Sequence, residues 1–182
     1  MKKKALLMVL AAALIVAASI GGTLAWLSDK TTAITNTFTA GDVEIELDET
    51  TGTTYTLVPG ATIAKDPTVT VIANSEDCYV FVKVTNPLGQ GITLDIASAD
   101  WQVVSTSGND TVYKYIGSEA NANDIILKNA AAVELAVFTT VTVPSTLTSL
   151  TGGQIAVTAY AVQANNLPAG LTDAQIYALA AA

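Results

Sequence analysis

Residues 20–47 decide the fold and read Ile-Gly-Gly-Thr-Leu-Ala-Trp-Leu-Ser-Asp-Lys-Thr-Thr-Ala-Ile-Thr-Asn-Thr-Phe-Thr-Ala-Gly-Asp-Val-Glu-Ile-Glu-Leu. The stretch begins at the end of a long apolar run and closes with the alternation Asp-Val-Glu-Ile-Glu-Leu, which is typical of a β-strand. It therefore divides the chain into an N-terminal export segment and a β-rich body.

The residues before this stretch have the organisation of a secretory signal peptide. Lys2, Lys3 and Lys4 precede an apolar run over residues 5–20, and these are the charged and apolar regions of such a signal. Small residues at Thr23 and Ala25 then suit the two positions that a signal peptidase reads. We expect residues 1–25 to be removed, which leaves Trp26 as the new N-terminus.

The alternative is an uncleaved membrane anchor. Residues 5–27 number 23, and a helix rising about 1.5 Å per residue over that length could cross a bilayer. Gly21 and Gly22 weaken such a helix, and no basic cluster follows it, so cleavage is favoured. Membrane contact would then last only until the signal is cut.

Composition limits the partners of the mature chain. Loss of the signal leaves 157 residues, with five lysines against sixteen acidic residues and a net charge of −11. A surface of this sign repels nucleic acid and anionic lipid. We therefore expect no nucleic-acid partner.

The absence of some residue types excludes whole classes of site. The chain has no His, so a Ser-His or Cys-His nucleophile pair and a histidine metal site are ruled out, and we expect no cofactor. The single cysteine, Cys78, cannot close a disulfide within the chain. Its apolar neighbours indicate a buried thiol, and an intermolecular disulfide is the alternative.

The body of the chain, residues 42–182, is predicted to be all-β: a single antiparallel, jelly-roll-like sandwich with a short C-terminal helix. Alternation slips by one residue at Gly41, which predicts a bulge or bend there and separates an extended N-terminal arm, residues 26–41, from the first core strand. The expected strands cover residues 42–48, 67–73, 78–85, 92–96, 101–105, 111–116, 133–143 and 154–163.

Three details of this prediction bear on the core and the turns. The strand at 78–85 is apolar on both faces and is expected to be central. Residues 106–110 are expected to form a hairpin loop. Thr172 and Asp173 can cap a helix over residues 174–181, whose Ile176 and Leu179 are spaced to dock on the sandwich.

Two acidic stretches raise the question of a cation. Glu44, Glu46 and Asp48 line the outward face of the first core strand, where either a bound cation or a solvated acidic surface would fit. A loop beginning at Glu119 resembles a calcium loop, but it lacks the glycine and glutamate that such a loop needs at its sixth and twelfth positions. We therefore predict no metal site.

With these residues laid out, the chain resembles the TasA and camelysin family of secreted biofilm-matrix and spore-coat-associated proteins of Gram-positive bacteria. The resemblance rests on four stretches in order along the chain: Gly-Gly-Thr-Leu-Ala (21–25), Asn-Thr-Phe-Thr-Ala-Gly-Asp-Val (36–43), Val-Pro-Gly-Ala-Thr-Ile-Ala-Lys-Asp-Pro (58–67) and Ala-Tyr-Ala-Val-Gln-Ala (159–164). Residues 89–131 carry no part of it.

The resemblance implies export, processing by a SipW-type signal peptidase, a jelly-roll domain and assembly into extracellular fibres. In such fibres the N-terminal arm of one subunit completes the sheet of the next, and an accessory subunit can anchor the fibre. Carried onto this chain, the cleavage residues are Thr23, Ala25 and Trp26. Ile34, Phe38 and Gly41 are the expected assembly residues of the arm.

Three functions remain in view. The first is a secreted structural protein that forms head-to-tail homopolymers in the extracellular matrix or at the cell surface. The second is a metalloprotease, as the camelysin name implies, although the missing histidines leave no ordinary zinc site. The third is a secreted module that binds a surface glycan or protein, with Trp101, Tyr113 and Tyr115 as its candidate aromatic residues.

Overall fold

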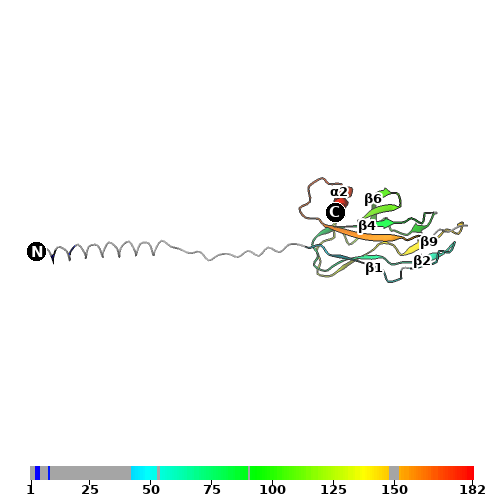
Figure 1. Ribbon diagram of the computed structural model, residues 1–182, viewed down its shortest axis with the longest axis horizontal. Helices are drawn as coiled ribbons and strands as arrows, with labels where there is room; N and C mark the ends of the chain where they lie inside the picture. The colour runs from blue at the N-terminus through cyan, green and yellow to red at the C-terminus, as the bar shows by residue number, and fades with distance from the viewer. Residues whose placement is uncertain (1–2, 5–7, 9–41, 53, 90, 148–151) are drawn as a thin grey trace. The chain divides into compact units, whose positions relative to one another are not determined.

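The computed structural model describes residues 3–4, 8, 42–52, 54–89, 91–147 and 152–182 (Figure 1). Residues Ala40–Ala182 form one compact unit. Its elements are β1 (Ile45–Asp48), β2 (Thr62–Ala64), β3 (Thr68–Val71), β4 (Cys78–Thr85), β5 (Thr93–Leu94), β6 (Trp101–Ser107), β7 (Asp110–Tyr115), β8 (Val133–Ala136), β9 (Thr140–Thr142), β10 (Ala156–Gln163) and α2 (Asp173–Ala180). Within the described residues, no helix is long and apolar enough to cross a membrane.

The strands form three antiparallel sheets. The largest has the order β10-β4-β7-β6, and the two smaller sheets have the orders β1-β3-β8 and β2-β9-β5. In Figure 1, β4 and β6 lie on one side of the domain and β1 and β2 on the other. The prediction of an all-β antiparallel domain with a short C-terminal helix is confirmed.

Strand β4 is the centre of the packing. It lies between β10 and β7, as its two apolar faces predict, and five of its eight residues are among the buried hydrophobic side chains. Val80, Val82 and Val84 point into the main core, while Phe81 points to the opposite face and packs in a second cluster with Ile176 of α2. The four-stranded sheet is therefore covered on both sides.

The main core joins all three sheets. Val69 of β3, Leu135 of β8 and Val141 of β9 pack in one cluster with the inward face of β4. Trp101 of β6 is 2% exposed, and its indole Nε1 donates a hydrogen bond of 2.8 Å to the carbonyl of Ala136. This bond satisfies the only polar group of a large buried side chain and ties the four-stranded sheet to β8.

The predicted strand at 133–143 is wrong as a single strand. β8 and β9 belong to different sheets, and the chain turns a corner between them at residues 137–139. Leu135 before the corner, Val137 at its first residue, and Val141 and Val143 after it are all buried in the same core. The alternation of the sequence continues because both segments face one core, so periodicity alone does not reveal the corner.

One turn, one bulge and one short strand also differ from the prediction. The hairpin between β6 and β7 has a two-residue turn at Gly108 and Asn109 in place of the expected five-residue loop, and Gly108 has a φ of +58° that suits this tight turn. β6 carries a bulge between Val103 and Ser105. The short strand β2 follows the turn at Pro59 and was not expected, because three residues are too few to show a period.

The C-terminal helix is capped as predicted but docks through a different set of residues. The Thr172 side chain accepts a hydrogen bond from the Gln175 backbone, and the Gln175 side chain accepts one from the Thr172 backbone. Ile176 is buried, as expected, whereas Leu179 is 50% exposed. Tyr177 takes its place, with its ring 5.7 Å from Phe81 and 5.3 Å from Tyr160.

A buried lysine reinforces this docking. Lys114 of β7 is 5% exposed, and its Nζ lies 2.9 Å from a carboxylate oxygen of Asp124 and 2.9 Å from one of Asp173. Burial opposes its charge, but the two carboxylates outweigh that effect and raise the pKa of Lys114. The ion pair joins β7 to the first turn of α2.

We predict that Ile176→Ala lowers the free energy of unfolding by about 2–3 kcal/mol, because it removes a buried side chain beneath the helix. The matched variant Leu179→Ala is expected to change the free energy of unfolding by less than about 1 kcal/mol, because Leu179 is half exposed. Urea unfolding followed by tryptophan fluorescence measures both values. Equal losses in the two variants would contradict this docking of the helix.

Candidate functional site

The candidate functional site begins with the free edge of the four-stranded sheet. β10 pairs with β4 over its full length of eight residues, and no other described strand pairs with its opposite side. Its sequence, Ala-Val-Thr-Ala-Tyr-Ala-Val-Gln, contains no charged residue and no proline. Natural proteins usually protect sheet edges with such residues, with bulges or with short strands. β10 is therefore an edge open to another strand.

Other edges in the described part of the chain are better protected. β6, at the opposite edge of the same sheet, has the bulge between Val103 and Ser105. β1 and β8, the two edges of their sheet, have four residues each, and β1 carries Glu46 and Asp48 while β8 carries Glu134. β2 and β5 have three and two residues. The contrast singles out β10.

A groove lies beside the beginning of β10. It consists of two adjoining hollows of about 200 and 410 Å³ that share Lys65, Val141 and Ile155 in their linings. The first hollow is also lined by Leu47, Asp48, Glu49, Pro67, Phe138 and Val157, and the second by Thr54, Tyr55, Leu57, Ile63, Leu88 and residues 153, 154 and 156. One wall comes from the start of β10, and the other comes from the end of β1 and the chain that leads to β2.

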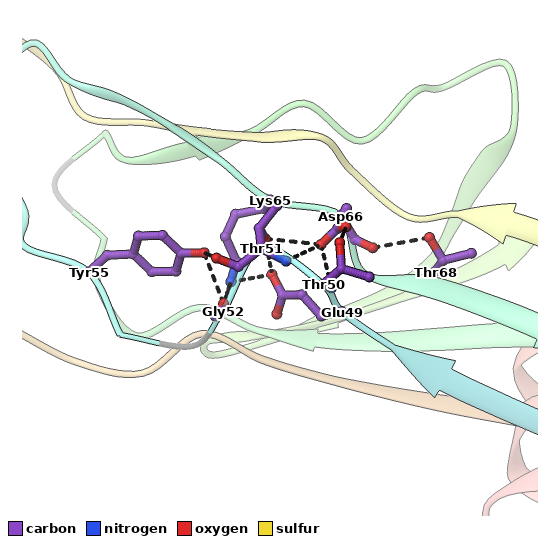
Figure 2. A network of polar contacts seen from close by, with 8 residues as sticks. All are labelled: Glu49, Thr50, Thr51, Gly52, Tyr55, Lys65, Asp66 and Thr68. Carbon is purple, nitrogen blue, oxygen red and sulfur yellow. Dashed lines mark hydrogen bonds and ion pairs between the residues drawn. The ribbon is translucent and has the colours of Figure 1, made fainter.

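A turn at the end of β1 forms part of this second wall and is held by one carboxylate (Figure 2). Asp66 accepts hydrogen bonds from the backbone N–H of Thr50 at 2.9 Å and of Thr51 at 3.0 Å. It also accepts from the hydroxyls of Thr50 and Thr51. The Thr50 hydroxyl, followed by the Thr51 N–H, lowers the pKa of Asp66 to about 2.

Lys65 binds the same turn through its ammonium group. Its Nζ forms an ion pair with Glu49, donates a hydrogen bond of 2.9 Å to the Gly52 carbonyl and lies 4.5 Å from the centre of the Tyr55 ring. The Tyr55 hydroxyl in turn donates to the carbonyls of Thr51 at 2.6 Å and Gly52 at 2.9 Å. Figure 2 shows these groups converging on the turn at residues 49–52.

A second carboxylate holds the corner between β8 and β9 in a similar way. Asp95 accepts hydrogen bonds of 2.7 Å from the backbone N–H groups of Thr139 and Thr140, and another from the Thr139 hydroxyl. Burial opposes the charge of Asp95, but these hydrogen bonds outweigh it and lower its pKa to about 2. Neither carboxylate could be recognised as a tether from the sequence, because each joins residues far apart in the chain.

The acidic residues considered as cation ligands do not gather into one group. Glu44, Glu46 and Asp48 are all exposed, which fits the solvated acidic surface. Asp124, in the loop that begins at Glu119, is engaged by Lys114. Among the described residues, no group of three or more His, Cys, Asp or Glu side chains is placed to hold a metal ion.

The aromatic candidates for a glycan site are largely internal. Trp101 and Tyr115 are buried, with ring centres 5.1 Å apart in an edge-to-face contact. Tyr113 is partly buried against the main core.

Cys78 is fully buried, and burial together with the charge of Asp77 raises the pKa of its thiol to about 11. The prediction of a buried thiol is confirmed.

The remaining candidate residues lie outside the described part of the chain. These are the expected cleavage residues Thr23, Ala25 and Trp26 and the expected assembly residues Ile34, Phe38 and Gly41. The described residues contain an open sheet edge and a groove.

Comparison with known families gives one match. Residues 1–75 match the family described as camelysin metallo-endopeptidase. The match includes the first three of the four stretches that carry the resemblance and confirms it over that part of the chain. No characterised protein and no solved structure has significant similarity to the chain.

We predict that the protein loses stability as the pH falls from about 4 to 2. The folded-state pKa values of Asp66 and Asp95 are about 2, against 3.8 for a free carboxyl. The stability that the two charged carboxylates add to the fold is therefore fully present above pH 3.8 and is lost as the pH falls toward 2. Asp95→Asn should reduce the fall of the thermal midpoint over this range. Asp42→Asn is the control, because the Asp42 carboxylate makes no hydrogen bond with the described residues. An unchanged slope in Asp95→Asn would contradict the tether.

Proposed function

We propose that this chain, whose residues 1–75 match the camelysin family, is a secreted structural protein that assembles into extracellular biofilm-matrix or surface fibres. Each subunit would insert its N-terminal arm, residues 26–41, beside the sheet of the next subunit. The observation that carries the proposal is the unprotected eight-residue edge of β10 next to a groove.

The length of the arm suits transfer to a neighbour. Residues 26–41 directly precede Asp42, where the described domain begins. Extended at about 3.3 Å per residue, they would span roughly 50 Å, which is longer than the eight-residue edge that receives them. An arm of this reach can leave its own domain and pair with another.

The chemistry of the edge suits a strand. The N–H and C=O groups on the free side of β10 would form a ladder with the backbone of the arm. Ile34 and Phe38 lie four residues apart and share one face of an extended strand. That face would meet the apolar part of the groove, which includes Val141, Ile155 and Val157.

The symmetry of the contact between subunits determines what kind of assembly they form. The arm of one subunit would occupy the edge of a second, whose own arm remains free for a third. Such a head-to-tail contact does not close on itself and generates filaments. Cleavage after Ala25 by a SipW-type signal peptidase would release the arm from the membrane and thus permit assembly, and an accessory subunit could anchor the growing fibre.

Proteolysis is the less supported function. The camelysin name denotes a metallo-endopeptidase, but zinc proteases of the usual kind bind zinc through histidines, and this sequence has none. A glycan-binding module is also weakly supported, because Trp101 and Tyr115 are buried in the core. We therefore favour a structural role.

We predict that protein beginning at Trp26 forms filaments and that protein beginning at Gly41 stays monomeric, because only the longer form retains the arm. Phe38→Asp in the longer form should also prevent growth, since it places a charge among apolar groups. Electron microscopy with light scattering reads out all three proteins.

The outcomes separate the candidate functions. Monomers from both forms would favour a binding module. Filaments from both would place the contact on the domain itself and overturn the strand mechanism. Chelator-sensitive cleavage of casein by purified protein would support the protease.

A pair of matched variants tests the place where the arm docks. Ile155 lines both hollows, and Val103 is an exposed valine on the opposite edge of the same sheet. We predict that Ile155→Lys slows filament growth by about tenfold or more, because an apolar strand would have to cover an unpaired ammonium. Val103→Lys should leave growth within about twofold, since surface substitutions have small effects. The reverse result would move the docking site to β6.

A further inference from the structure

We propose that the turn at residues 49–52 is a latch that restrains entry to the groove, and that Asp66 keeps it closed. The inference rests on the proposed function, because it concerns how the same groove is controlled. In the free subunit the latch would be shut, and an incoming strand would have to open it.

The turn and the groove share one side chain. Lys65 lines both hollows at the point where they adjoin, and its ammonium is held by Glu49, the Gly52 carbonyl and the Tyr55 ring. Glu49 and Tyr55 are themselves lining residues. Movement of the turn would therefore free Lys65 and change the groove along both hollows.

Asp66 also occupies backbone N–H groups just beyond the end of β1. It binds the N–H groups of Thr50 and Thr51, which come two and three residues after the strand ends at Asp48 and would otherwise be free to pair with another chain. A strand that enters the groove meets a wall whose backbone donors are already occupied. Release of these two groups from Asp66 would extend the available edge beyond Asp48.

The latch can open without unfolding the domain. The hydrogen bonds to Asp66 and from Tyr55 lie at the surface, and Thr50, Thr51 and Tyr55 are exposed, whereas the Lys65 and Glu49 side chains of the ion pair are 13% and 23% exposed. By contrast, the bond from Trp101 to Ala136 anchors a buried side chain in the core. Elements with exposed hydrogen bonds and few buried apolar contacts are those that open locally at low free-energy cost.

The test compares filament growth of the chain beginning at Trp26 with that of two latch variants. Asp66→Ala removes the carboxylate that accepts four hydrogen bonds from Thr50 and Thr51, and we expect growth about fivefold faster or more, because these net-favourable bonds are lost at once. Tyr55→Phe removes the two hydroxyl bonds but keeps the ring over Lys65, and it should give a smaller acceleration.

Asp77→Ala is the matched control. The Asp77 carboxylate also accepts a backbone N–H, that of Lys128 at 2.8 Å, but the residue does not line the groove. This variant should grow at the rate of the unchanged protein. A growth rate raised equally by Asp77→Ala would show general loosening of the domain and would overturn the latch.

A measurement on the monomer distinguishes this inference from the proposed function. Hydrogen exchange at the Thr50 and Thr51 amides should be at least about fivefold faster in Asp66→Ala than in Asp77→Ala, whether or not filaments form. Filaments from the unchanged protein at the same rate as from Asp66→Ala would overturn the latch and leave the proposed function intact. Absence of filaments in every variant, with exchange at Thr50 and Thr51 accelerated, would overturn the proposed function and with it the role of the latch.

Discussion

The packing of β4 on both of its faces is the constraint on which the rest of the domain depends. One face of the strand needs the two smaller sheets, and the other needs the C-terminal helix, since neither set of valine and aromatic side chains can be left in water. β10 pairs with its full length on one side, and β7 pairs with residues 81–85 on the other. The central strand is thus paired on both sides, and the edges of the sheet are moved outward to β10 and β6.

Polar side chains hold in place the turns and the helix end that the apolar core does not fix. Asp66, Asp95 and Lys114 each join segments that are distant in the sequence: a turn to the start of β3, a corner to the end of β5, and a strand to a helix. Asp66 and Asp95 act at the surface through threonine N–H and hydroxyl groups, whereas Lys114 acts in a buried position with two carboxylates. Loops without a core of their own are held in place by such directional bonds.

Much of the fold could be predicted from the sequence, because alternation reports which side chains face a core. The central position of β4, the buried thiol of Cys78 and the cap at Thr172 all followed from local patterns. The corner after β8 did not, because the same alternation persists on both sides of it. The groove and its tethers could not be predicted either, since they bring together Glu49, Lys65 and Ile155 from three separate segments, and local periodicity carries no information on such encounters.

The sulfur content of the chain has a consequence for a protein exposed to the environment. Both methionines, Met1 and Met8, lie in the expected signal peptide, so the mature chain would contain no thioether. Its single thiol, Cys78, is fully buried and held protonated at neutral pH by its raised pKa. Oxidation by peroxide begins with accessible thiolates and thioethers. A material built from this domain would therefore offer peroxides no sulfur to attack.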